Sequence, residues 1–370
     1  MKILICLGTR PEAIKMAPLY YELKKQIGLE VKLCITAQHR EMLDQVLRFF
    51  EIQADFDLDI MKHDQTLNSL SASILSKVER VLLEFQPNLV LVHGDTTTSS
   101  MAALAAFHCA IKVGHVEAGL RTYNKKSPFP EELNRQLIAR IADFHFAPTQ
   151  KAFNNLVDEG INKEKVVLSG NTVIDALLFT IDKIENGYKP SFSEELSKKV
   201  DFKKDIILVT GHRRESFGEG FKNLCEALLE ISKNKAVEII YPVHFNPNVK
   251  KIVYEMLSNI TNIHLIDPLD YVNFVWLMGK SNLIITDSGG IQEEAPSFNI
   301  PVLVTREKTE RTEGVKAGFL CLVGTNKAKI INKANDLLYL KRIKNVNSNP
   351  YGDGKASQKI VAFLKKCINK

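Results

Sequence analysis

Short apolar runs alternate with longer amphipathic stretches along the whole chain. The runs have the length of strands, and the stretches repeat apolar residues at helical spacing. This alternation is typical of βαβ units around a mainly parallel sheet. In the first half we expect strands at residues 3–7, 31–36, 89–93, 113–117, 145–147 and 166–168, and helices at residues 12–25, 41–50, 67–85, 97–108, 131–142 and 150–158. Pro18, Pro128 and Pro130 are expected near helix starts or in loops, because proline lacks a backbone N–H.

The pattern lapses into a charged, polar stretch between residues 182 and 205, which indicates a domain boundary. It resumes with expected strands at residues 206–210, 237–243, 263–266, 283–286, 301–304 and 319–323. We therefore expect an N-terminal Rossmann-like domain over residues 1–185 and a C-terminal one over residues 186–355. An amphipathic terminal helix at residues 356–370 is a candidate to pack back on the first domain. Two such domains are expected to face each other across a cleft, with ligands at the carboxyl ends of the strands.

Composition narrows the class of protein. A chain of 370 residues exceeds the usual size of a single core, and shares of 45% hydrophobic and 25% charged residues are those of an ordinary globular protein. The net charge of +6 comes largely from lysine-rich surface stretches without interleaved aromatic residues. Nucleic-acid binding is therefore not predicted, whereas a small anionic substrate would suit the charge.

The six cysteines are scattered and form no Cys-x-x-Cys pair. They indicate core thiols in a reducing compartment and neither a disulfide framework nor a zinc site. No apolar run approaches the roughly 18 residues of a membrane span, and the first apolar run is too short for a signal peptide. The expected location is the cytoplasm, with no membrane partner.

The segment TDSGGIQEEAP, residues 286–296, joins an expected buried strand to a helix through a Ser-Gly-Gly turn. Backbone N–H groups at a helix start are unpaired, and Gly289 and Gly290 let an anion approach them, so the turn is suited to a diphosphate. Glu294, one turn further on, is placed to reach a ribose hydroxyl. An ordinary helix start capped by Asp287 or Ser288 would look the same, so this segment alone leaves both interpretations open.

Charged and small polar residues follow nearly every expected strand. In the first half they are Arg10, Lys15, Asp95, Glu117, Glu131 and Arg135, and in the second half His212, Arg213, His244, Ser288 to Gly290 and Arg306. Singly, each has a simpler explanation, such as a helix cap or a strand end. Together, at one edge of both sheets, converging carboxylates provide acids and bases that work near neutral pH. Cations nearby would balance a bound diphosphate and favour its departure as a leaving group.

Several motifs are absent from the sequence. The first strand leads into GTRPE and not Gly-x-Gly-x-x-Gly, so a nicotinamide cofactor is not expected. No P-loop, Gly-x-Ser-x-Gly or His-Glu-x-x-His motif occurs either. Phosphoryl transfer from a nucleoside triphosphate, serine-ester chemistry and zinc-peptidase chemistry therefore lose support.

With these residues assembled, the chain resembles the non-hydrolysing UDP-N-acetylglucosamine 2-epimerases. The matching segments are GTRPEAIKMAP (8–18), TAQHREMLDQ (36–45), VHGDTTT (92–98), GHVEAGLR (114–121), TGHRRE (210–215), YPVH (241–244), TDSGGIQEEAP (286–296) and NPYGDG (349–354). The ordered set spans nearly the whole chain. The resemblance implies a GT-B-like fold of two Rossmann-type domains, a homodimer without cofactor or metal, and interconversion of UDP-N-acetylglucosamine and UDP-N-acetylmannosamine for surface polysaccharide precursors.

The resemblance also implies roles for individual residues. Its catalytic residues fall on Asp95, Glu117, Glu131 and His212. The substrate contacts of the family fall on Arg10, Lys15, Phe274, Ser288, Gly289, Gly290, Glu294 and Arg311, with a backbone contact at Leu269. Arg135 is a further candidate contact, because it is expected at the same sheet edge, or rim, as Asp95 and Glu117. An allosteric site for a second UDP-sugar maps to Gln38, Glu41, Arg213 and His244, but Asp64 replaces an arginine there and would repel a diphosphate. Thr312 replaces a proline often found after the Glu-Arg pair.

Other activities remain open at this stage. An epimerase for a decorated UDP-sugar, such as a diacetamido uronic acid, is not excluded by any residue. A hydrolysing relative would release N-acetylmannosamine, although the segments around Glu131 and His212 favour the non-hydrolysing branch. A GT-B glycosyltransferase or a catalytically silent nucleotide-sugar sensor would share the nucleotide-binding segment 286–296, which we call the clamp. Neither would need a cluster of acids at the edge of the first sheet.

Overall fold

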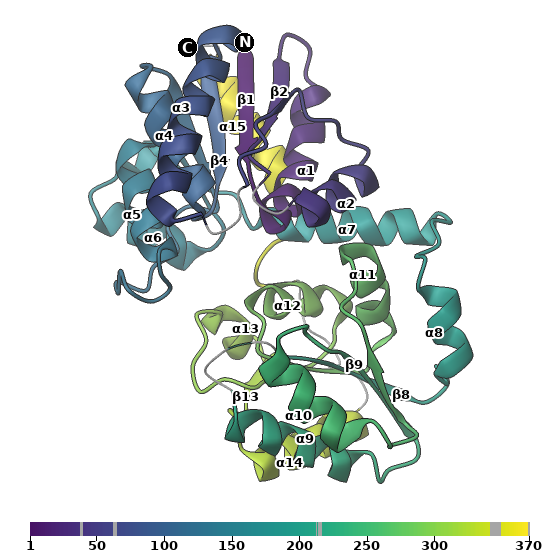
Figure 1. Cartoon of the computed structure of the whole chain (residues 1–370). Helices are drawn as coiled ribbons and strands as arrows, with labels where there is room; N and C mark the ends of the chain where they lie inside the picture. Colours follow the sequence, from purple (N-terminus) through teal and green to yellow (C-terminus); the bar gives the residue numbers. More distant parts are fainter. Residues whose placement is uncertain (38–39, 62–64, 212, 214–216, 341–348, 369–370) are drawn as a thin grey trace. The chain divides into compact units, whose positions relative to one another are not determined.

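The computed structural model describes residues 1–370 except 38–39, 62–64, 212, 214–216, 341–348 and 369–370, and gives only the backbone of Leu340 and Ile368. The chain divides into two compact units (Figure 1). The first unit is Met1–Phe179 with Tyr351–Lys370, and the second is Thr180–Pro350. The division falls within helix α7 (Thr172–Glu185), and helix α15 (Ala356–Ile368) belongs to the first unit.

The first unit is built on a parallel sheet with the strand order β3-β2-β1-β4-β5-β6-β7. Its strands are β1 Lys2–Leu7, β2 Glu30–Ile35, β3 Phe56–Asp57, β4 Leu89–His93, β5 Lys112–Val116, β6 Phe144–Ala147 and β7 Val166–Leu168. Besides α7 and α15, its helices are α1 Arg10–Lys24, α2 Arg40–Phe49, α3 Leu67–Phe85, α4 Thr97–His108, α5 Glu131–Ile141, α6 Gln150–Asp158 and the 3₁₀ turn η1 Lys163–Lys165.

The second unit repeats the plan with the order β10-β9-β8-β11-β12-β13, again parallel throughout. Its strands are β8 Asp205–Thr210, β9 Val237–Pro242, β10 Ile263–Ile266, β11 Leu283–Thr286, β12 Val302–Val304 and β13 Leu320–Leu322. Its helices are α8 Ser193–Lys199, α9 Glu219–Ile231, α10 Pro247–Leu257, α11 Tyr271–Lys280, α12 Gly289–Glu294, η3 Ala295–Phe298, α13 Thr312–Lys316 and α14 Lys327–Leu340.

Each sheet is buried on both faces, which explains why its strands read as continuous apolar runs. In the first unit, α3 and α4 contribute a buried cluster against β1, β4 and β5, while α1 contacts α2 and α15. Phe363 of α15 packs edge-on against Phe144 and Phe146 of β6, with ring centroids 5.6 and 5.9 Å away. In Figure 1, α9, α10 and α14 gather on one face of the second sheet and α11 and α12 on the other.

The strand order of each sheet reverses between two neighbouring strands, which are β1 and β4 in the first unit and β8 and β11 in the second. Ligands of open α/β sheets bind outside the carboxyl ends of the strands at such a reversal. The residues that follow β1 and β4 are Gly8 to Arg10 and Gly94 to Asp95. The fold therefore presents the predicted rim residues where open α/β sheets bind ligands.

Some elements differ from the sequence expectations. Pro18 is the ninth residue of α1 and is buried, so the expectation that it lies near a helix start or in a loop was wrong. Packing of α1 on the sheet offsets the hydrogen bond that proline cannot donate. Residues 182–205, where the apolar pattern lapses, contain the last turn of α7 and all of α8. Helix α8 buries one residue, Leu196, and so gives no periodic signal. The two-residue edge strand β3 was too short to predict.

Candidate functional site

Asp95 lies in the loop after β4 and is held by α5. Arg135 Nε donates a hydrogen bond to Asp95 Oδ2 at 2.8 Å, and Arg135 Nη2 forms an ion pair with the same oxygen at 2.6 Å. Asn134 Nδ2 donates to the Asp95 carbonyl at 2.8 Å. His115 Nε2 contacts the carbonyl of Gly94 at 2.7 Å, and burial lowers the pKa of His115 to about 3, so the neutral ring donates this bond. The Asp95 carboxylate is thereby fixed in position, while its side chain remains 24% exposed.

Glu117 follows β5 in the left-handed backbone conformation, with φ 61°. This conformation is uncommon for a residue with a Cβ and is frequent at functional sites. The carboxylate forms an ion pair with Lys15 Nζ of α1, and the two side chains are only 10% and 15% exposed. His93 Nε2 lies 3.7 Å from Glu117 Oε2. Burial lowers the pKa of His93 to about 4, so this imidazole is neutral at neutral pH and Lys15 is the cation beside Glu117.

Two adjacent acids begin α5, and their surroundings differ. Glu132 is fully buried and accepts hydrogen bonds from the backbone N–H groups of Thr122 and Tyr123 and from Gln136 and Arg135. Burial alone would raise the pKa of Glu132, but these donors lower it below its usual value.

Glu131, by contrast, has a buried Oε2 atom without a hydrogen-bond partner among the described residues. It lies four residues before Arg135 and therefore on the same face of α5. The described residues therefore leave one buried oxygen of this carboxylate without a hydrogen bond.

The loop after β1 is shaped by close packing at Gly8. A Cβ built on Gly8 would lie 2.2 Å from Thr36 Oγ1 and 2.3 Å from Thr98 Oγ1. These two hydroxyls are themselves hydrogen-bonded at 2.8 Å. Only glycine fits here, and Arg10 follows as the first residue of α1.

In the second unit, the loops after β8 and β11 are joined at Asp287. The Arg213 backbone N–H donates to Asp287 Oδ2 at 2.9 Å, and its Nε donates to the Asp287 carbonyl at 3.1 Å. The hydroxyls of Thr210 and Thr286 are 2.6 Å apart, and the Ser288 N–H donates to Thr286 Oγ1 at 2.9 Å. Arg213, expected at an allosteric site, thus lies next to the Ser-Gly-Gly turn.

Arg311 lies over this turn. A Cβ on Gly289 would meet the three outer guanidinium atoms of Arg311 at 3.0–3.2 Å, whereas one on Gly290 would have, among the described residues, no neighbour closer than Ser288 Oγ at 4.0 Å. Glu293 holds the guanidinium through Nε at 3.0 Å. The second unit therefore combines a cation with a glycine turn, as a phosphate site requires.

The remaining predicted contacts of the second unit lie on or before α11 and α12. Glu294 ends α12 and is 7% exposed. It lies beside the partly buried Tyr271, whose pKa is raised first by desolvation and then by the Glu294 carboxylate. Phe274 on α11 is half-buried, and Leu269 precedes this helix in a partly exposed loop.

Three predicted residues, His212, Gln38 and Asp64, lie outside the described residues. Glu41 is exposed in the first turn of α2. His244 is exposed after β9 and accepts a hydrogen bond at Nδ1 from the Asn246 N–H at 3.1 Å. The expected allosteric set therefore has no geometric test here.

Sequence reasoning missed the roles of Glu12, Glu132 and His93, all buried at the rim. The signal for Glu12 was present, because Thr9-x-x-Glu12 has the spacing of a capping box. Glu132 could not be told from Glu131 by sequence, since both suit a helix start.

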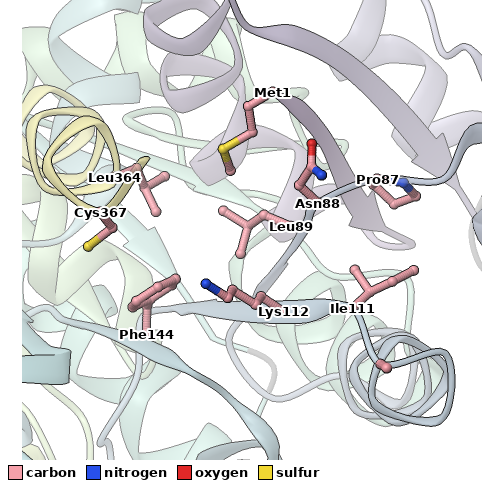
Figure 2. Close-up of a pocket in the computed structure, with 10 residues that line it drawn as sticks. Met1, Pro87, Asn88, Leu89, Ile111, Lys112, Phe144, Leu364 and Cys367 are labelled. Atoms are coloured by element: carbon pink, nitrogen blue, oxygen red, sulfur yellow. The ribbon is translucent and has the colours of Figure 1, made fainter. Parts of the chain in front are cut away.

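One described pocket lies at the opposite edge of the first sheet (Figure 2). It measures about 520 Å³ and is lined at the amino ends of β4, β5 and β6 and by the end of α15, with Lys112 reaching into it. None of the predicted site residues lines it. Within the described ranges, no group of three or more His, Cys, Asp and Glu side chains is placed to hold a metal, and no helix is long and apolar enough to cross a membrane.

Known proteins match the chain over its full length. The profile of the family described as UDP-N-acetylglucosamine 2-epimerase matches residues 21–365. A Campylobacter jejuni protein named UDP-N-acetylglucosamine 2-epimerase is 52% identical over 378 aligned residues, covering 100% of this chain and 98% of that protein. One of the same name from Escherichia coli K12 is 50% identical over 372 residues, covering 99% and 98%.

Solved structures agree with the sequence matches. The crystal structure of UDP-GlcNAc 2-epimerase from Neisseria meningitidis bound to UDP-GlcNAc has a TM-score of 0.88 at 48% identity and covers 99% of this chain and 100% of that one. The two parallel sheets and this similarity confirm the predicted GT-B-like class of two Rossmann-type domains. The chain belongs to the UDP-N-acetylglucosamine 2-epimerase family.

Proposed function

We propose that this protein epimerises UDP-N-acetylglucosamine at carbon 2, giving UDP-N-acetylmannosamine, and that it does so without hydrolysis. Relatives that share about half of their residues with the chain are named UDP-N-acetylglucosamine 2-epimerase. The observation that carries the proposal is the acid cluster at the carboxyl edge of the first sheet. There, Asp95 and Glu117 are each paired with a cation, and Glu131 keeps an oxygen without a partner among the described residues.

The second unit is proposed to bind UDP. Gly289 and Gly290 open the turn to the diphosphate, and Arg311 supplies positive charge directly above it. The Glu293 carboxylate keeps the Arg311 guanidinium oriented before any ligand arrives, which lowers the entropic cost of binding. Glu294 is assigned to the ribose and Phe274 to the uracil side.

The proposed reaction is an elimination followed by a re-addition. A base removes the proton from carbon 2 while the carbon 1–oxygen bond breaks, and the bond electrons leave with UDP. A double bond forms between carbons 1 and 2, giving 2-acetamidoglucal. UDP then adds back to carbon 1, and a proton reaches carbon 2 from the opposite face. Because the carbon 2 hydrogen is not adjacent to a carbonyl, its removal depends on the departing diphosphate.

Inversion requires proton-transferring groups on both faces of the sugar, which a cluster of acids provides. We assign this work to Asp95, Glu117, Glu131 and His212. Lys15 stabilises negative charge on Glu117, so Glu117 is suited to act as a base. Arg135 does the same for Asp95 and fixes its direction through a hydrogen bond and an ion pair to one oxygen.

Product analysis tests this function against its rivals. The protein is incubated with UDP-N-acetylglucosamine and followed by phosphorus and proton NMR. The proposal requires a stable mixture of two UDP-sugars with no build-up of UDP. Accumulation of free UDP and N-acetylmannosamine would assign the protein to the hydrolysing branch. No conversion of this substrate, with conversion of a diacetamido uronic acid derivative, would assign it to the decorated sugars.

The resemblance further predicts a homodimer, a cytoplasmic location and a supply of precursors for surface polysaccharide. Light scattering on the purified protein measures its molecular mass and so tests whether it is a dimer. Activation by added UDP-N-acetylglucosamine would support the allosteric site, and hyperbolic kinetics without activation would argue that Asp64 has removed it.

A further inference from the structure

Glu12 is a carboxyl group deep inside the first unit that the proposed reaction does not use. It lies in the first turn of α1 and is 1% exposed. Its hydrogen-bond partners come from two different loops at the carboxyl edge of the sheet, and those that the structure describes are all uncharged.

One oxygen of Glu12 serves the loop after β1. Oε2 accepts from the backbone N–H groups of Gly8 and Thr9 at 3.0 and 2.8 Å and from Thr9 Oγ1 at 2.8 Å. All three partners are donors, so this oxygen behaves as an acceptor only.

The other oxygen, Oε1, meets hydroxyls at the start of α4. Thr96 Oγ1 lies 2.6 Å away and Ser99 Oγ 2.9 Å away. Ser99 Oγ also lies 2.6 Å from the carbonyl oxygen of His93, which can only accept. Ser99 has one proton and two short contacts to oxygens that could accept it, Glu12 Oε1 and the His93 carbonyl. Its third oxygen contact, Thr96 Oγ1 at 3.2 Å, has a proton of its own and a shorter contact to Glu12.

The protons can be counted. If Glu12 were ionised, Ser99 could donate either to Glu12 or to the His93 carbonyl, and the other pair of oxygens would face each other at hydrogen-bond distance without a proton. A proton on Glu12 Oε1 removes the conflict. Glu12 then donates to Ser99, Ser99 donates to the His93 carbonyl, and Thr96 donates to Glu12 Oε1.

The electrostatic surroundings agree with the count. Burial raises the pKa of Glu12, although the hydroxyl and N–H donors act in the opposite direction. The Cys6 thiol of β1 shares this interior, and its own pKa is raised well above the usual value, first by its contact with Cys34 and then by burial. The described groups that hydrogen-bond to Glu12 are all uncharged, so none of these partners is a cation that would stabilise its ionised form.

We propose that Glu12 is a neutral carboxylic acid in the folded protein, and that its proton locks together the loops that carry the candidate catalytic residues. Through Oε2 it fixes the loop that leads to Arg10. Through Thr96 it fixes the residue next to Asp95, and through Ser99 it fixes the carbonyl of His93, whose ring faces Glu117. Glu12 is thus a positioning residue. This positioning role rests on the proposed function, but the protonation state does not.

The Glu12→Gln variant tests the protonation state, because an amide keeps an acceptor on one side and a donor on the other, as a neutral acid does. At neutral pH, the infrared difference spectrum of wild type minus variant should contain the carbonyl band of a neutral carboxylic acid. Loss of carboxylate bands instead would overturn the proposal. The same readout applies if the variant folds poorly, because in the wild-type protein alone the acid band must persist at neutral pH and disappear only on alkaline titration.

Ser99→Ala provides the matched control, since it removes the acceptor of the Glu12 proton and leaves the acid in place. The acid band should persist in this variant but shift in frequency, and an unshifted band would contradict the assigned hydrogen bond. For the positioning role, Glu12→Gln should retain kcat within a few-fold, whereas Glu12→Ala should lose kcat far more than affinity for UDP. Equal losses of kcat in the Gln and Ala variants would refute the role of the proton. If neither epimer forms in wild type, the proposed function fails while the infrared result still decides the protonation state.

Discussion

The structure gives the adjacent acids Glu131 and Glu132 opposite roles, and replacing each by glutamine separates them. Glu132 accepts four hydrogen bonds, two at each oxygen, at 2.9–3.2 Å. A glutamine can accept only through its one oxygen, so its amide nitrogen would face two donors. A buried donor left unpaired costs about 1–3 kcal/mol, so Glu132→Gln should destabilise the protein by about 2–6 kcal/mol.

Thermal unfolding measures this loss, which corresponds to a decrease in Tm on the order of 10 °C for a unit of this size. The effect should also depend on pH. The folded pKa of Glu132 lies below its ordinary value of 4.5, so its contribution to stability is present above that value and is lost as pH falls through the folded pKa. Wild type and Glu132→Gln should therefore become more similar in stability in acid.

The matched variant, Glu131→Gln, should keep the wild-type free energy of unfolding within about 1 kcal/mol, because Glu131 Oε2 has no partner to lose among the described residues. It should instead abolish epimerisation while leaving UDP binding intact. A stable Glu132→Gln together with an unfolded or fully active Glu131→Gln would refute the assignment of both acids.

Four further substitutions probe other parts of the two units. Lys15→Met removes the cation paired with Glu117 and should lower kcat on the order of 10²-fold with little change in KM, measured at saturating substrate; an unchanged kcat would show that the pair is only structural. Gly8→Ala places a Cβ 2.2–2.3 Å from two threonine hydroxyls and should cost about 1–3 kcal/mol of stability, while Gly290→Ala, with no described neighbour closer than 4.0 Å, should cost far less. Arg311→Lys replaces the planar guanidinium and should weaken UDP binding roughly tenfold, measured by calorimetry. An unchanged affinity would show that Arg311 does not contact the diphosphate.

Much of the fold could be predicted from the sequence because both sheets are parallel and doubly covered. Their strands are then short apolar runs with clear limits, and β4, β7, β10 and β11 match the expected residues. The same logic places Asp95 and Glu117 at one edge, because every parallel strand carries its following residue to the same side. The periodic signal failed where an element buries little, as in α8.

The sequence could not give the pairing of charges or the distribution of protons. Glu131 and Glu132 are the same residue type at adjacent positions. They differ because the backbone N–H of Thr122, from the loop before α5, donates to Glu132. The sequence also could not show that Arg213 contacts Asp287 beside the Ser-Gly-Gly turn. Such contacts depend on residues far apart in the chain, for which one sequence holds no local signal.

Exchange of the carbon 2 hydrogen with solvent tests the central claim most directly. The protein is incubated with UDP-N-acetylglucosamine in deuterated water, and carbon 2 is followed by NMR in wild type and in Glu117→Gln. The account predicts deuterium at carbon 2 of both epimers while the UDP-sugars persist, and no exchange in the variant, which should still bind UDP. Epimerisation without deuterium incorporation, or exchange at the wild-type rate in Glu117→Gln, would contradict it.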